Sequence, residues 1–139
     1  DYIGVDAYFP ISESKTPGLD EVKEKWQTIN TDLKTLSKIE EKPILFTEFG
    51  YRSIDYAGQK PWDASDIDGL VNEKAQRNLL NGLFQSVWDK PWFAGGFLWK
   101  WFYIPEQLSA HHDNRFCVHG KQAEKDLKLW YEKFQSKEE

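Results

Sequence analysis

The residue best placed for chemistry is Glu48, which ends the short apolar run 43–47 and is followed by Phe49 and Gly50. An apolar run of this length bounded by proline and glycine predicts a buried strand, so Glu48 is expected where that strand leaves its sheet. In a barrel of parallel strands the carboxyl-terminal strand ends carry the chemistry, and a carboxylate there can act as a nucleophile or as a general acid or base. A solvated glutamate at a strand terminus explains the pattern equally well.

The composition is that of one compact, acidic domain. Of the 139 residues, 40% are hydrophobic and 16% aromatic, which is enough apolar bulk for a core and argues against disorder. The net charge of −5, with no basic cluster, argues against nucleic acid and anionic membranes as partners. The many Trp and Tyr residues suit sugars, whose C–H faces stack on aromatic rings, although aromatic residues are also ordinary core material.

No pattern in the sequence indicates a metal or a cofactor. The single Cys117 excludes an intrachain disulfide and a structural zinc site of the usual kind. His111, His112 and His119 match no established ligand spacing, and a contact with substrate is the better interpretation for one of them. No stretch approaches the roughly 18 consecutive apolar residues of a transmembrane helix. The compartment stays undecided. Because the sequence contains no Met, we expect a mature, trimmed or partial chain.

The elements that must position Glu48 follow one repeated pattern. Apolar residues at steps of three and four alternate with short apolar runs, which predicts strand, helix, strand, helix, strand, helix. This order is typical of right-handed βα units and a parallel sheet. A doubly wound open sheet would show the same alternation, but the chain has no glycine-rich phosphate loop. The expected strands are 2–8, 43–48 and 93–99, and the expected helices are 19–39, 71–88 and 120–134.

The alternation of side chains along each strand predicts a shared inner face. Asp6 and Tyr8 have the parity opposite to the apolar positions of the first strand. On the second strand we assign Ile44, Phe46 and Glu48 to one parity. Asp6, Tyr8, Glu48 and Trp99 are therefore expected to point inward at the same end of three neighbouring strands.

Three segments carry a resemblance to a known family. The segments 2–10, 47–51 and 95–101 resemble the sixth, seventh and eighth strands of retaining glycoside hydrolases of clan A, and the closest likeness is to glycoside hydrolase family 113, the endo-β-1,4-mannanase-type barrels. The resemblance implies a (β/α)₈ barrel. Because a complete barrel takes about 250 residues, residues 1–139 are expected to form a partial catalytic domain, the carboxyl-terminal portion with about strands 6 to 8.

The resemblance also implies roles for single residues. Glu48 matches the family's nucleophile at the end of the seventh strand. Tyr8 matches an aromatic residue that can hydrogen-bond the nucleophile, so both are expected to be catalytic. Trp99 matches the tryptophan that forms the floor of the subsite for the cleaved sugar. Asp6 lies in the sixth-strand signature, where it either contacts substrate or ties strands together.

Two further tryptophans are expected to bind substrate, and one essential group is missing. Trp101 shares the parity of Trp99, and Trp62 lies in the predicted loop 52–68. A clan A enzyme also uses a general acid/base glutamate on its fourth strand, usually preceded by Asn. The only Asn-Glu pair, Asn72-Glu73, begins a predicted helix. We therefore expect the acid/base and the remaining barrel strands to belong to the rest of a longer protein.

These observations favour a retaining glycoside hydrolase fragment acting on a β-linked polysaccharide, with β-1,4-mannan as the first candidate. Its expected partners are the oligosaccharide or polysaccharide and the remaining barrel strands. Two alternatives stay open. One is a non-catalytic carbohydrate-binding or scaffolding barrel, and the other is a barrel enzyme of unrelated chemistry that uses Glu48 as a proton-transfer base.

Overall fold

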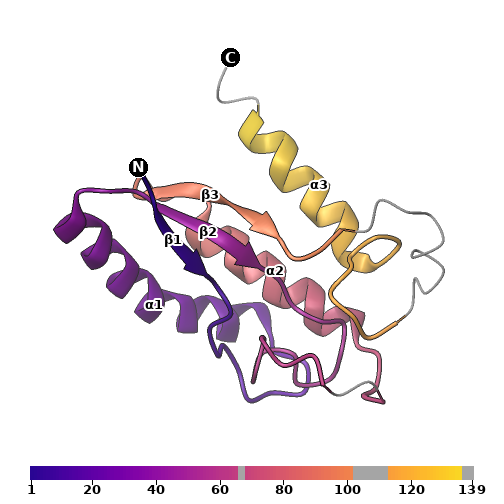
Figure 1. Ribbon diagram of the computed structural model, residues 1–139. Coiled ribbons are helices and arrows are strands. Elements are labelled where there is room, and N and C mark those ends of the chain that lie inside the picture. The colour runs from indigo at the N-terminus through magenta and orange to yellow at the C-terminus, as the bar shows by residue number, and fades with distance from the viewer. Residues whose placement is uncertain (66–67, 102–112, 136–139) are drawn as a thin grey trace.

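The computed structural model describes residues 1–65, 68–101 and 113–135. Strands and helices alternate along the described chain (Figure 1), and every boundary lies within two residues of the predicted range at each end. The elements are β1 (Ile3–Asp6), α1 (Leu19–Glu40), β2 (Ile44–Phe49), α2 (Glu73–Val87), β3 (Phe93–Leu98) and α3 (Gln122–Gln135).

The three strands form one parallel sheet in the order β1-β2-β3, so β1 and β3 are its edges. The arrowheads of the strands in Figure 1 point the same way, toward the loops that follow them. Helices α1 and α2 pack against one face of the sheet and against each other, and α3 packs on α2. No described helix covers the opposite face, which we call the open face. Among the described residues, no helix has both the length and the apolar character needed to cross a membrane.

Aromatic side chains fill the layer between the sheet and the helices. Phe46 is fully buried beside Trp26 of α1, and Phe49 is fully buried edge-on to Phe84 of α2. The two helices approach closely because position 82 is a glycine: a Cβ there would lie 2.2 Å from the Cγ1 atom of Val22. Such dense packing makes the covered face the core of the described structure.

The structure corrects one detail of the predicted strand faces. Ile44 and Phe46 lie on the helix side and are fully buried, so the prediction that they share an inward face with Glu48 was wrong. The reason is a bulge in β2. Val5 pairs with Phe46 but Asp6 pairs with Glu48, which leaves Thr47 as an extra residue. The bulge changes the alternation and brings Glu48 to the open face, beside Asp6.

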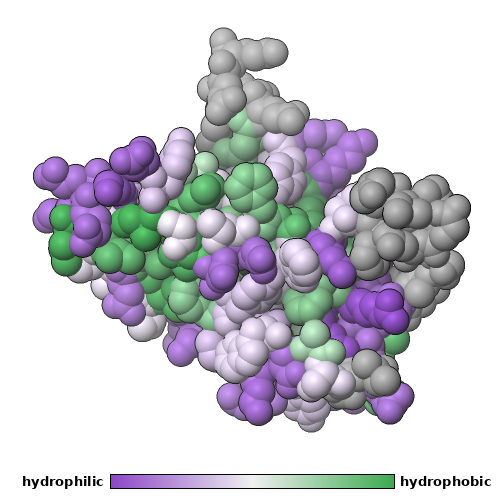
Figure 2. Space-filling view, viewed as in Figure 1, coloured by the Kyte–Doolittle hydropathy of each residue, from purple (hydrophilic) through white to green (hydrophobic). Residues whose placement is uncertain are grey.

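The open face is apolar along much of the sheet and polar where the strands end. Tyr2 before β1 and Phe97 on β3 are 61% and 65% exposed. Figure 2, viewed as in Figure 1, shows apolar surface over the sheet, with more polar surface toward the loops that follow the strands. Large exposed apolar side chains on a sheet face indicate a surface that is normally covered.

Candidate active site

Tyr8 and Glu48 meet where β1 and β2 end. The Tyr8 hydroxyl donates a hydrogen bond to Oε2 of Glu48 at 2.9 Å, which is the contact that the sequence predicted. The Ala7 amide continues the pairing of the strands by donating to the Glu48 carbonyl at 2.7 Å, which carries Tyr8 past the end of β1 to the carboxylate. Burial of the ring and the hydrogen bond to Glu48 both raise the pKa of Tyr8. Tyr8 is therefore a stable neutral donor to this carboxylate.

Asp6 contacts the neighbouring strand. Its Oδ1 atom accepts a hydrogen bond of 2.6 Å from the Thr47 hydroxyl. Thr47 can reach Asp6 because the bulge holds both side chains on the open face. Asp6 thus ties β1 to β2 next to Glu48, which is one of the two roles expected for it, and the contact with substrate stays a prediction.

Trp99 leaves the sheet at the same end as Glu48. Its backbone amide donates to the carbonyl of Phe49, the residue after Glu48, at 2.7 Å. The side chain is 42% exposed, and the ammonium of Lys100 lies 5.2 Å from the centroid of its ring. Gly50 permits this arrangement, because a Cβ there would lie 2.0 Å from the Trp99 carbonyl oxygen. The ends of β2 and β3 therefore approach each other through backbone contacts.

The other predicted sugar-binding tryptophans are both exposed. Trp101 is 49% exposed and makes an edge-on contact with His119 at 5.0 Å between ring centroids. Trp62 is 55% exposed, and among the described residues no hydrogen bond or ring contact joins it to the Tyr8–Glu48 pair. Residues 111 and 112, which the sequence analysis considered as histidine contacts to substrate, lie outside the described residues.

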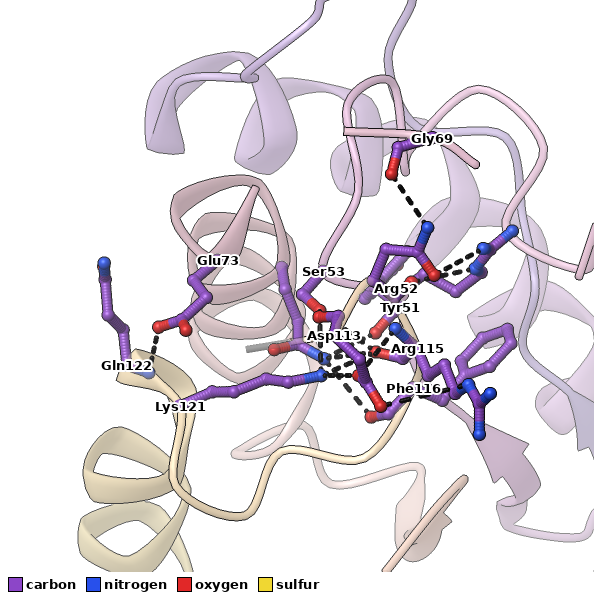
Figure 3. A network of polar contacts seen from close by, with 12 residues as sticks. Tyr51, Arg52, Ser53, Gly69, Glu73, Asp113, Arg115, Phe116, Lys121 and Gln122 are labelled. Carbon is purple, nitrogen blue, oxygen red and sulfur yellow. Dashed lines mark hydrogen bonds and ion pairs between the residues drawn. The ribbon is translucent and has the colours of Figure 1, made fainter. Parts of the chain in front are cut away.

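Sequence reasoning missed a buried polar network behind the strand ends (Figure 3). The Lys121 ammonium is almost fully buried and donates to the Ser53 hydroxyl and to Oδ1 of Asp113, each at 2.8 Å. It also donates to the Arg115 carbonyl at 3.0 Å. A buried charge is stable only when it is paired and hydrogen-bonded in this way. Lys121 therefore fixes the segment 113–116 to the loop after β2.

Two more side chains reinforce this connection. Arg52 donates to the carbonyl of Asn114 at 3.0 Å and to its side-chain oxygen at 3.1 Å. Gln76 of α2 donates to the carbonyl oxygens of Tyr51 at 2.9 Å and Phe116 at 3.2 Å. Figure 3 shows Ser53 of the loop after β2 beside Asp113 and Arg115 of the segment before α3, with the Lys121 side chain reaching them.

The network reaches the candidate site through Phe116. This ring is buried and makes an edge-on contact with the Tyr8 ring, with 6.3 Å between centroids. The residues that link 51–53 to 113–116 therefore also support the ring whose hydroxyl contacts Glu48. Sequence reasoning had little to identify Lys121 and Arg52 as supporting residues, because a lysine before a helix and an arginine in a polar loop are ordinarily on the surface.

The described part of the chain offers no evident metal centre. Within residues 1–65, 68–101 and 113–135, no group of three or more His, Cys, Asp or Glu side chains lies close enough to hold a metal ion. Cys117 is a buried free thiol. His119 is engaged with Glu124, with 3.1 Å between Nδ1 and Oε1.

Comparisons with known proteins agree with this geometry. The sequence profile of Glycoside Hydrolase Family 113 matches residues 1–121. A family 113 β-1,4-mannanase structure superimposes with a TM-score of 0.73 at 24% identity, over 95% of this chain and 39% of that one. The structure of the family 113 β-mannanase AaManA from Alicyclobacillus acidocaldarius, in complex with ManMIm, superimposes with a TM-score of 0.73 at 29% identity. The match covers 98% of this chain and 39% of that one.

A more distant structure shares the fold alone. The β-glucuronidase of Faecalibacterium prausnitzii matches with a TM-score of 0.58 at 16% identity, over 95% of this chain and 22% of that one. A search of the curated proteins finds no match. The chain spans 39% of the length of the mannanases that it matches. With its profile match over residues 1–121, this chain belongs to glycoside hydrolase family 113, and its three βα units form part of a (β/α)₈ barrel.

Proposed function

We propose that this chain is part of a retaining β-mannanase in which Glu48 is the nucleophile. The observation that supports the proposal best is the hydrogen bond of 2.9 Å between Tyr8 and Glu48 at the carboxyl ends of parallel strands. Catalytic residues of (β/α)₈ barrels lie at this end of the strands. Membership in family 113 and the structural likeness to β-mannanases support the glycosidase assignment and the choice of β-1,4-mannan.

The proposed reaction has two steps. Glu48 attacks the anomeric carbon and forms a glycosyl ester, while a carboxylic acid protonates the departing glycosidic oxygen. Water, deprotonated by that second group, then cleaves the ester, releases the sugar with retained configuration and returns the proton. This route needs two carboxyl groups about 5 to 5.5 Å apart. We propose that the acid/base comes from the whole protein outside these 139 residues, because the chain spans 39% of the length of its mannanase relatives.

The neighbouring side chains have supporting roles in this proposal. Tyr8, kept neutral by its raised pKa, donates to Glu48 and holds this carboxylate in one orientation. Trp99 forms the floor of the subsite for the cleaved sugar, and Trp101 and Trp62 are additional sugar contacts. Asp6 keeps β1 and β2 in register beside the nucleophile through its bond with Thr47.

The test compares the full-length protein with two variants on β-mannan and β-glucan. Glu48→Gln should lower hydrolysis by at least about a thousandfold while leaving oligosaccharide binding largely intact, since the amide keeps the shape but cannot form the ester. Trp99→Ala should weaken binding and turnover together. We expect the 139-residue chain by itself to hydrolyse neither polymer.

Near-normal activity of the full-length Glu48→Gln protein would contradict the proposed nucleophile. If the unmodified full-length protein bound β-mannan without cleaving it, the carbohydrate-binding alternative would replace the enzyme.

A further inference from the structure

The loop after β2 contains a cavity that the proposed chemistry does not use. Its volume is about 260 Å³, which corresponds to roughly nine water molecules at about 30 Å³ each. Drug-sized ligands occupy pockets of about 300 Å³ or more, so this cavity holds about one small ring. Its polar walls are formed by Asp55, Gln59, Lys60 and Asp63, and its apolar walls include Pro61.

Charged groups of both signs surround the cavity. Asp55 and Asp63 are acidic and Lys60 and Arg52 are basic, and Lys15 pairs with Asp55 at 3.4 Å. Such a lining offers both hydrogen-bond donors and acceptors. A neutral ligand rich in hydroxyl groups fits this chemistry better than a phosphate or a carboxylate.

Tyr56 lines the cavity. Its side chain is 50% exposed, and its backbone is left-handed with φ of 61°. This conformation is unfavourable for a tyrosine by about 1 to 2 kcal/mol. Backbone hydrogen bonds of 3.0 Å, from the Tyr56 amide to Lys15 and from the Gln59 amide to Tyr56, hold it in place. A strained aromatic residue kept at a cavity wall indicates a functional constraint.

The cavity is connected to the candidate active site through a rigid side chain. Arg52, which begins the loop soon after Glu48, lines the cavity and donates to the Asp63 carbonyl at 3.3 Å. The same guanidinium donates to Asn114. The cavity is therefore fixed relative to the loop after β2 and the segment 113–116.

We propose that this cavity is an outlying sugar subsite that binds one neutral hexose ring of the same β-linked chain whose bond is cleaved at Glu48. The proposal rests on the proposed function for the identity of the chain. The ring stacks a C–H face on Tyr56, and its hydroxyl groups exchange hydrogen bonds with the polar wall. Only oligosaccharides long enough to reach from the Glu48 subsite to the cavity gain from it.

The test measures binding against oligosaccharide length in the full-length protein carrying Glu48→Gln, which binds without cleaving. β-1,4-linked manno-oligosaccharides of increasing length are titrated calorimetrically, with the cello-oligosaccharide series as a second arm. Tyr56→Asn removes the ring but tolerates the left-handed backbone, and Gln59→Ala removes one polar group. Leu129→Ala, at an exposed position on α3, is the control.

We expect Tyr56→Asn to weaken binding of the long oligosaccharides about fivefold to tenfold and to leave the short ones unchanged. Gln59→Ala should have a smaller effect of the same kind, and the control should have none. Circular dichroism spectra of the variants verify that each is folded.

The subsite would be overturned if the folded Tyr56→Asn and Gln59→Ala variants bound oligosaccharides of every length with the same affinity as their parent. It would also be overturned if the parent bound neither series of oligosaccharides. A third outcome separates the two proposals. If binding depends on oligosaccharide length and the variants lose that dependence, but the unmodified full-length protein hydrolyses neither polymer, the subsite stands and the proposed function is rejected.

Discussion

The two faces of the sheet use the same three strands for different purposes. On the covered face, Phe46 and Phe49 are fully buried against α1 and α2. On the open face, Phe97 is largely exposed, and the strand ends carry the Tyr8–Glu48 hydrogen bond. The covered face therefore supplies the stability of the described structure, while the open face supplies groups that need a ligand or further protein to complete them.

The contrast begins with side-chain alternation, which gives each strand two faces. The bulge at Thr47 modifies this alternation where β2 ends, so that Glu48 follows the buried Phe46 and still reaches the open face. Bulges of this kind are common beside active sites because they redirect a side chain.

The largest effect on stability should come from truncating a buried side chain on the covered face. We expect Phe46→Ala to lower the free energy of unfolding of the 139-residue chain by about 3 to 5 kcal/mol, because it leaves a cavity in a dense aromatic cluster. Phe97→Ala is the matched control and should cost less than about 1 kcal/mol, since its ring is exposed. Urea denaturation compares the two, and similar losses from both would remove the distinction between the faces.

The second-largest effect on stability is expected from a substitution in the buried polar network around Lys121. Lys121→Met keeps the length of the side chain but leaves Ser53 and Asp113 without their buried donor. The expected loss in unfolding free energy is about 2 kcal/mol. Lys125→Met, at an exposed position of α3, should change stability little. If thermal unfolding shows the same midpoint for both variants, Lys121 does not fix the segment 113–116.

The open face should make the isolated chain self-associate. Both β1 and β3 are sheet edges in the described structure, and Tyr2 and Phe97 are exposed beside them. We expect concentration-dependent oligomers in sedimentation velocity, weakened about tenfold by replacing both aromatic residues with Ser. A chain that sediments as a monomer at every concentration would contradict this prediction.

Tyr8→Phe should separate function from stability. The change removes one hydrogen bond to Glu48 and keeps the ring against Phe116, so unfolding free energy should fall by less than about 1 kcal/mol. In the full-length protein we expect turnover to fall about tenfold because the nucleophile is less well oriented. Tyr2→Phe serves as the control in the same kinetic assay. Unchanged turnover in Tyr8→Phe would show that the hydrogen bond is only structural.

The smallest effect is expected at the outer surface of the helices. Burial acts to raise the pKa of Asp126, but hydrogen bonds from Arg77 and Asn81 outweigh it and lower the pKa. The stability from Asp126 is therefore present above the ordinary aspartate pKa of about 3.9 and is lost as pH falls through the lower folded value. Asp126→Asn should cost a few tenths of a kcal/mol at pH 7. The difference in unfolding free energy between the Asp126→Asn variant and its parent should vanish as pH is lowered from 7 to 2. A difference that stays constant over this range would contradict the lowered pKa of Asp126.

Much of the fold followed from local patterns. Helical spacing and short apolar runs predicted all six elements, and the order of three strand-end motifs indicated the family that the profile match confirms. The Tyr8–Glu48 hydrogen bond was also predicted, because the resemblance matched Tyr8 to an aromatic residue that bonds the nucleophile and strand alternation placed both side chains at the same end of the sheet. The face of Phe46 was predicted wrongly, since a bulge changes the alternation without any signal in residue type.

The sequence by itself determined which segments are strands and helices, because periodicity and turn residues act over a few neighbouring positions. It also determined that a carboxylate ends a buried strand. Only the tertiary structure decided what supports that carboxylate: Lys121 meets Ser53, and Arg52 meets Asn114, across separations of 68 and 62 residues. Such contacts depend on how whole elements pack, so no local pattern encodes them. The fold places Phe116 on Tyr8 for the same reason, and with it the orientation of Glu48.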